Sequence, residues 1–128
     1  MAPAGTDTSA RIVVVADDDP ASLEGLRALL AAWGYEVETA PDGRAALEKV
    51  SEVHPSAVIT DLVMPTMNGL ELLNVLHDEE PTLPVILLTA HGNLNHLRDA
   101  AQQGAFAYLR KPVDVLKLKT VLASALAA

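Results

Sequence analysis

Short runs of consecutive apolar residues alternate along the chain with longer segments in which apolar residues recur every three or four positions. The short runs are rich in β-branched residues, and an unbroken apolar run predicts a strand buried on both faces, as in a parallel sheet. One run alternates apolar and polar residues instead, which is typical of an edge strand. The five expected strands cover residues 11–16, 36–40 (the alternating run), 57–60, 85–89 and 106–109.

The longer segments predict five helices. The first begins with Asp19 as N-cap and Pro20 in its first turn, and it ends before Gly34, a typical C-cap residue. The others are expected from 41–43 to about 53, from 70 to before 81, over 94–103 and over 113–127. Strands that alternate with helices predict an α/β fold, a parallel sheet with helices on both faces. Ligands of such sheets bind at the carboxyl ends of the strands, near the point where strand order reverses.

Length and composition are those of one globular domain. The chain has 128 residues, half of them apolar and a fifth charged, and this size is typical of a single domain. We expect residues 1–10, which are rich in Ala, Gly, Ser, Thr and Pro, to form a flexible N-terminal tail, and residues 11–128 to form the domain. The chain has no cysteine, which excludes thiol chemistry and disulfides.

Charge and hydropathy bear on whether the chain contacts nucleic acid or a membrane. The net charge of −8 argues against direct nucleic-acid contact by this domain, because phosphate contacts need clustered Lys and Arg. No apolar run approaches the roughly 20 residues of a membrane span. The first ten residues lack the pattern of a signal peptide. We therefore expect a cytoplasmic protein without membrane contact.

Polar residues that can carry chemistry follow four of the five expected strands. They are Asp17, Asp18 and Asp19 after the first strand, Asp61 after the third, Thr89 at the end of the fourth and Lys111 after the fifth. Each has an ordinary explanation by itself, since aspartates cap helices or stand in turns and most lysines are solvated at the surface. For Asp19, capping remains the better interpretation. The pair Lys111–Pro112 is compatible with a plain turn and with a cis bond that would aim the lysine.

These polar residues are all expected at one edge of the sheet, which favours a shared chemical role over a separate structural role for each. Two carboxylates about 4 Å apart repel each other by on the order of 4 kcal/mol at an effective dielectric of about 20. Mg²⁺ would offset that repulsion, because it prefers a few carboxylate oxygens and also bridges to phosphate. Lys111 and Thr89 could bind phosphate oxygens, and a central carboxylate could be the nucleophile that forms an acyl phosphate. Phosphoryl transfer depends mostly on positioning and charge neutralisation, so these groups suffice.

Four segments of the sequence resemble, in order, the signature segments of response-regulator receiver domains. They are VVVADDDP, TDLVMPTMNGLELL, PVILLTAHG and GAFAYLRKPVD, and the resemblance covers about residues 11–126. It implies a flavodoxin-like, doubly wound sheet with strand order 2-1-3-4-5. It also implies a two-component phosphorelay protein that accepts a phosphoryl group from a histidine kinase or a phosphotransfer protein, and that is not itself an enzyme in the usual sense.

The same resemblance implies a role for each candidate residue. Asp61 matches the phosphoacceptor, and Thr89 and Lys111 match the pair that binds the phosphoryl oxygens. The implied Mg²⁺ ligands are Asp17, Asp18 and Asp61 with the backbone carbonyl of Val63, and Asp18 is a direct ligand.

Tyr108 matches the aromatic switch residue of these domains, which turns inward as Thr89 moves toward the phosphoryl group. The resulting change is expected at the surface formed by the fourth helix, the fifth strand and the last helix, which would bind a partner or a second copy of the chain. The segments TAHGNL and QQGAFAYLRKPVD look most like receivers attached to σ54-dependent transcription activators. A stand-alone receiver and a receiver of a hybrid kinase remain alternatives.

Two functions of other classes stay open on the sequence alone. Asp17-x-Asp19 after a buried strand also resembles the nucleophile motif of haloacid-dehalogenase-type phosphatases, although the chain is short for that family and Asp61 would then have no role. The other is a receiver-like docking module that binds partners without phosphorylation. Steady phosphomonoester hydrolysis would favour the enzyme, and binding that ignores phosphate and Mg²⁺ would favour the docking module.

Overall fold

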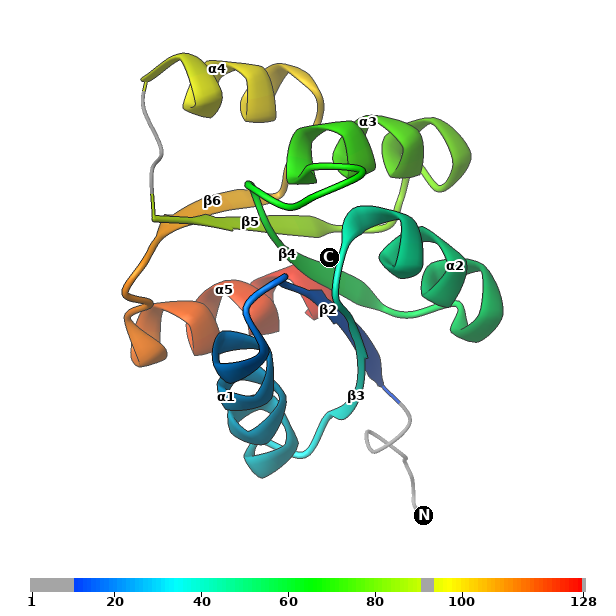
Figure 1. The fold of residues 1–128 in the computed structure, drawn as a ribbon. Helices are drawn as coiled ribbons and strands as arrows, with labels where there is room; N and C mark the ends of the chain where they lie inside the picture. Colours follow the sequence, from blue (N-terminus) through cyan, green and yellow to red (C-terminus); the bar gives the residue numbers. More distant parts are fainter. Residues whose placement is uncertain (1–10, 91–93, 128) are drawn as a thin grey trace.

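A computed structural model of the chain describes residues 11–90 and 94–127, which form one α/β unit (Figure 1). The tail expected at residues 1–10 lies outside the described residues and stays a prediction. The described strands are β2 (Ile12–Ala16), β3 (Glu36–Ala40), β4 (Ala57–Asp61), β5 (Val85–Thr89) and β6 (Ala107–Arg110). The described helices are α1 (Pro20–Ala32), α2 (Gly43–Val53), α3 (Gly69–Glu79), α4 (Leu94–Gln102) and α5 (Val115–Ala127).

The five described strands form one parallel sheet in the order β3-β2-β4-β5-β6. Counted by succession along the chain, this is the order 2-1-3-4-5, so the expected flavodoxin-like topology is confirmed. The chain builds the sheet from β2 to β3 in one direction and then returns to the other side of β2. Strand order therefore reverses between β2 and β4, and the loops that leave these two strands diverge at that point.

Helices cover both faces of the sheet, with α1 and α5 on one face and α2, α3 and α4 on the other (Figure 1). Alternate residues of a strand point to opposite faces, so the central strand β2 sends Val13 and Val15 to one core and Val14 and Ala16 to the other. Burial on both faces explains why this strand is an unbroken apolar run. Among the described helices, none is long and apolar enough to cross a lipid bilayer.

Several element boundaries differ from the sequence prediction by one or two residues, and for the last helix and the last strand the local reason is clear. The last helix begins at Val115 and not at 113, because Asp114 is its cap and accepts the amide of Lys117 at 3.1 Å. The last strand is Ala107–Arg110 and not 106–109, because Arg110 pairs in register with Thr89 and extends the ladder by one residue.

The ends of α1 are as expected. The Asp19 side chain accepts the Ser22 amide at 3.2 Å and the Ser22 hydroxyl at 2.8 Å, which confirms its capping role. Beyond the helix, Gly34 has φ 97°, a left-handed conformation that favours glycine. The turn at Gly34 sends the chain from α1 into the edge strand β3.

Two glycines on α1 and its C-terminal turn allow a matched test of backbone strain. A β-carbon would meet nothing within 4 Å at either Gly25 or Gly34, so the two positions differ in backbone conformation alone. Gly34→Ala should lower the free energy of unfolding by about 1 kcal/mol, whereas Gly25→Ala, inside the helix, should raise it by about 0.5 to 1 kcal/mol. Urea unfolding of both variants checks this, and a stabilising Gly34→Ala would contradict it.

Candidate functional site

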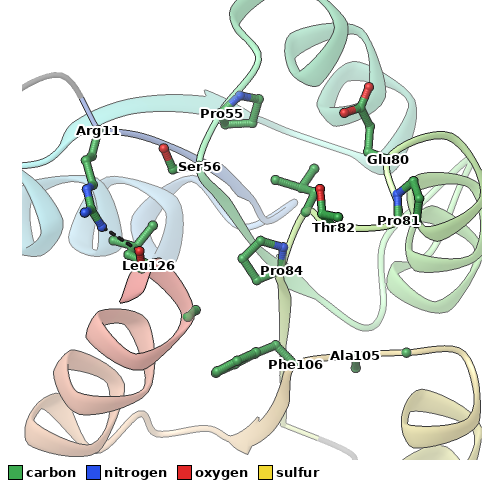
Figure 2. Close-up of a pocket in the computed structure, with 13 residues that line it drawn as sticks. Arg11, Pro55, Ser56, Glu80, Pro81, Thr82, Pro84, Ala105, Phe106 and Leu126 are labelled. Carbon is green, nitrogen blue, oxygen red and sulfur yellow. Dashed lines mark hydrogen bonds between the residues drawn. The ribbon is translucent and has the colours of Figure 1, made fainter. Parts of the chain in front are cut away.

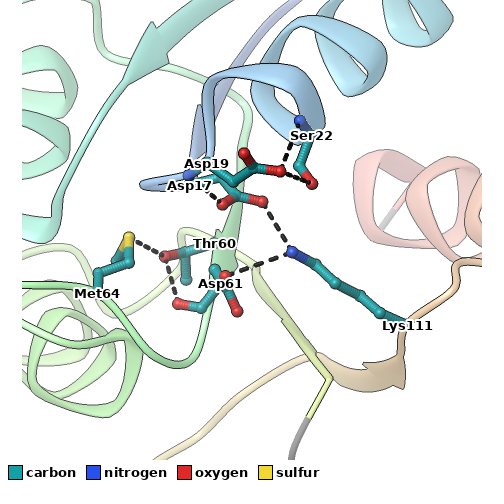
Figure 3. A network of polar contacts seen from close by, with 7 residues as sticks. All are labelled: Asp17, Asp19, Ser22, Thr60, Asp61, Met64 and Lys111. Atoms are coloured by element: carbon teal, nitrogen blue, oxygen red, sulfur yellow. Dashed lines mark hydrogen bonds and ion pairs between the residues drawn. The ribbon is translucent and has the colours of Figure 1, made fainter.

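A lysine and two aspartates form an ion-pair cluster at the carboxyl edge of the sheet (Figure 3). The Nζ atom of Lys111 lies 2.8 Å from Oδ2 of Asp17 and 3.3 Å from Oδ2 of Asp61. Solvent reaches 20% of the lysine side chain, 13% of Asp61 and only 1% of Asp17. Lys111 stands 94 positions from Asp17 and 50 from Asp61 along the chain, so the fold alone brings the three charges together.

A third carboxylate completes an acidic group. Asp17, Asp18 and Asp61 can each offer one oxygen such that all three atoms lie within 4.8 Å of one another. Asp18 is exposed, Asp61 is half-buried and Asp17 is buried. Hard oxygen donors at this spacing fit a cation such as Mg²⁺ and do not suit a softer metal that prefers nitrogen or sulfur. Asp19 caps α1 and is outside this group.

A small hollow of about 210 Å³ opens beside the acidic group. It is lined by Asp18, Asp61, Val63, Thr89 and Ala90. The hollow is thus lined by residues at or just after the ends of β4 and β5 and by the loop after β2.

Backbone hydrogen bonds hold the charged residues in place. The backbone amide of Asp17 donates to the Ala40 carbonyl at 3.1 Å. The Oδ1 atom of the Asp17 side chain accepts a hydrogen bond from the Asp19 amide at 2.9 Å. On the other side, the Lys111 amide donates to the Thr89 carbonyl at 2.8 Å, and the Lys111–Pro112 peptide bond is cis. Lys111 is therefore carried by the same edge of the sheet that ends in Thr89.

The loop after Asp61 contains residues that the sequence analysis did not single out. A β-carbon on Gly69 would lie 2.4 Å from the carbonyl oxygen of Asp61, so α3 can start this close to the site only with glycine. Met64 is buried with its sulfur 3.9 Å from the Thr60 hydroxyl, and it anchors the loop in the core. The glycine after Asn68, at the start of an expected helix, was the available signal for this close approach.

The pKa values of Asp61 and Lys111 are both raised, for different reasons. Burial raises the pKa of Asp61, the positive charge of Lys111 lowers it, and the charge of Asp17 raises it again, with a net upward shift. Burial acts to lower the pKa of Lys111, but its hydrogen bond with Asp17 and the charge of Asp61 outweigh burial and raise the pKa. Lys111 is therefore firmly charged at neutral pH, and the Asp61 carboxylate is held at some energetic cost.

Thr89 and Tyr108 lie on neighbouring strands next to this cluster. Thr89 ends β5 and is buried, and Tyr108 on β6 pairs in register with Leu87. Burial raises the pKa of the Tyr108 hydroxyl, while the nearby Thr89 side chain lowers it. That hydroxyl is itself buried, and it makes no hydrogen bond of normal geometry with any described residue.

A larger hollow of about 920 Å³ lies at the opposite, amino-terminal edge of the sheet (Figure 2). Its lining includes Ser56, Pro84 and Phe106, each directly before or close to the start of a strand. Arg11 crosses one side of it, and its Nη1 atom donates to the Leu126 carbonyl at 2.9 Å. The size of this hollow does not make it the chemical site, since the acidic group and its lysine are at the other edge.

Comparison with known proteins gives consistent results. Residues 13–123 match the family model of the response regulator receiver domain. The chain is 40% identical over 115 residues to the transcriptional regulatory protein ZraR of Klebsiella oxytoca, which covers 90% of this chain and 26% of that protein. It is 41% identical over 104 residues to the DNA-binding transcriptional regulator NtrC of Escherichia coli K12, over 81% of this chain and 22% of that protein.

The fold comparison agrees with the sequence comparison. The structure of a CheY-like response regulator receiver domain protein from Methanospirillum hungatei JF-1 matches with a TM-score of 0.88 and 30% identity, over 91% of this chain and 94% of that chain. The chain spans about a quarter of the length of the two transcriptional regulators. With the parallel sheet, the acidic edge and the family match over most of its length, this chain belongs to the response regulator receiver domains of two-component signalling systems.

Proposed function

We propose that Asp61 is the phosphoacceptor of this receiver and that Mg²⁺ is held by Asp17, Asp18, Asp61 and the backbone carbonyl of Val63. The observation that carries the proposal is the position of Lys111, whose Nζ bridges Asp17 and Asp61 beside the hollow that Thr89 and Val63 line. Buried Asp17, half-buried Asp61 and exposed Asp18 bring three carboxylate oxygens within 4.8 Å of one another, which suits a divalent cation, and the hollow of about 210 Å³ beside them supports a place for a phosphoryl group.

The proposed transfer uses few groups. An oxygen of Asp61 attacks the phosphorus atom of a phosphohistidine, the new O–P bond forms, and the P–N bond to the imidazole breaks. Lys111 holds its positive charge and can turn from Asp61 to a phosphoryl oxygen. The Thr89 hydroxyl can donate to a second oxygen. When bound, Mg²⁺ neutralises charge that develops on the phosphoryl oxygens.

The proposed output is a switch that runs from Thr89 to Tyr108. Movement of Thr89 toward the phosphoryl group would vacate space beside β5, and the Tyr108 ring could enter it. The Tyr108 hydroxyl is buried without a hydrogen bond of normal geometry to the described residues, so no strong bond ties the ring to its present position. The affected surface is that of α4, β6 and α5, where we propose that a partner or a second copy of the chain binds.

The biological setting is proposed from the relatives. We propose a cytoplasmic receiver that a histidine kinase or phosphotransfer protein phosphorylates, with no direct nucleic-acid contact by this domain. Several relatives are named as transcriptional regulators, and this chain covers only their receiver part. The domain acts as a signalling protein, with chemistry limited to its own phosphorylation and dephosphorylation.

Incubation with acetyl phosphate tests the phosphoacceptor directly. The wild-type protein should gain one phosphoryl group in its intact mass, and only with Mg²⁺ present. Asp61→Asn should gain none, whereas Asp78→Asn, at an exposed position of α3, should react like wild type. A folded wild-type protein that gains no adduct, or an adduct that survives Asp61→Asn, would refute the assignment, and the first result would favour the docking module.

The raised pKa of Asp61 predicts a stabilising variant in the metal-free protein. An acid whose folded pKa lies above its unfolded value binds more protons when folded, so its carboxylate destabilises the fold above that pKa. Asp61→Asn should therefore raise the free energy of unfolding at pH 7. The gain should vanish as the pH falls through the raised pKa to below 3.8, the ordinary value. Urea unfolding with EDTA at several pH values checks this, and a gain that persists at low pH would contradict it.

Charge reversal tests the proposed output surface. Arg98 on α4 and Arg110 on β6 are both exposed there, and Arg44 on α2 is exposed elsewhere. Arg98→Glu and Arg110→Glu should weaken phosphorylation-dependent self-association by about tenfold or more, because like charges across an interface cost several kcal/mol. Arg44→Glu should not. Sedimentation with and without acetyl phosphate measures this, and self-association that survives both reversals would place the interface elsewhere.

A further inference from the structure

The first residue of α2 touches the loop that follows Asp61. Gly43 is buried, and a β-carbon built on it would lie 2.3 Å from the Met67 carbonyl oxygen and 2.9 Å from Cβ and Cγ of the same residue. Among the described glycines, positive φ angles occur at Gly34 and Gly104 and not at Gly43. The missing side chain at Gly43 therefore serves close approach and not an unusual backbone conformation. The nearest atom is a backbone oxygen, which cannot rotate away as a side chain would.

The loop has little freedom to absorb a displacement of Met67. The Met67 amide donates to the Pro65 carbonyl at 2.7 Å. The residue between them, Thr66, has φ 63°. The ring of Pro65 fixes its own φ, and a non-glycine residue in the left-handed region is already strained. Met64 is 7% exposed and anchored in the core. Residues 65–67 thus form a stiff segment that ends at the anchored Met64. A displacement of this segment would strain the peptide unit between Val63 and Met64, which carries the Val63 carbonyl.

Helix α2 cannot easily retreat instead. Ala46 and Val50 of this helix are 0% and 4% exposed and pack in the core against the sheet. Asp42 fixes the start of the helix by accepting the Ala45 amide at 2.8 Å. Moving α2 away from Met67 would open a gap in a close-packed core, which costs free energy. A displacement that starts at position 43 therefore passes mainly into the loop.

We infer that Gly43 is a positioning residue for the metal site, because it leaves the space that Met67 occupies and so leaves undisturbed the loop that carries the Val63 carbonyl. The inference rests on the proposed function, in which that carbonyl is a ligand of Mg²⁺. It adds a residue on α2, an element that contributes no ligand. The path runs from Gly43 through Met67 to Val63, and it involves no charged group.

Gly43→Ala tests the inference, with Gly25→Ala as the matched control. Both variants add one methyl group to a helical glycine, but a β-carbon at position 25 meets nothing within 4 Å. Mg²⁺ is titrated into each unphosphorylated protein, and the amide resonances of residues near Asp61 are followed by NMR. Gly43→Ala should bind Mg²⁺ about tenfold more weakly, as is typical when a group that orients a ligand is altered. Gly25→Ala should bind it like wild type.

The outcomes separate the inference from the proposed function. Equal Mg²⁺ affinity in wild type and a folded Gly43→Ala overturns the positioning role and leaves the site itself intact. A wild-type protein without Mg²⁺-dependent shifts near Asp61 overturns the proposed metal site. If Gly43→Ala does not fold, the wild-type titration decides. The Gly43 amide should then shift with the same midpoint as the site residues, while the Gly34 amide at the opposite edge stays still, and an unmoved Gly43 overturns the inference.

Discussion

The ion pair between Lys111 and Asp17 is the interaction on which the site depends. Asp17 is almost completely removed from water, and a buried carboxylate without a partner would cost several kcal/mol. One lysine at 2.8 Å from Asp17 and 3.3 Å from Asp61 makes it possible to keep two carboxylates in one small volume. The contact with Asp61 is the longer of the two, so the proposed turn of Lys111 toward a phosphoryl oxygen would leave the pair with the buried Asp17 in place.

The parallel sheet brings the charged residues of the site together with only short loops. Residues at the ends of β2, β4 and β6 meet because all strands run in one direction, and each needs only a short loop to reach the shared edge. The two cores on either side of the sheet are close-packed, so the strand ends are fixed relative to one another. The switch proposed for Thr89 and Tyr108 accordingly involves side chains at this edge and no rearrangement of the sheet.

The sequence was most informative where burial on two faces constrained it. The apolar run in residues 11–16 predicted a strand buried on both faces, and the observed strand Ile12–Ala16 confirms it. The end of that run also indicated where the polar residues after the strand begin. Pairing within the site was harder to predict. That Lys111 lies closer to Asp17 than to Asp61 depends on strand spacing and side-chain reach, which no local pattern encodes. The contact of Gly43 with Met67 was missed for the same reason, since both partners look like ordinary loop and helix residues.

The hydrogen bond from Arg11 to Leu126 has a consequence for how the domain can be combined with others. It joins the residue before β2 to the last turn of α5, so the first and the last described residues lie near each other. Both are at the amino-terminal edge, turned away from the charged cluster. A domain with adjacent ends can be inserted into a surface loop of a host protein, or fused at either end, with little distortion of either fold. Here such a graft would also leave the edge with the charged cluster uncovered.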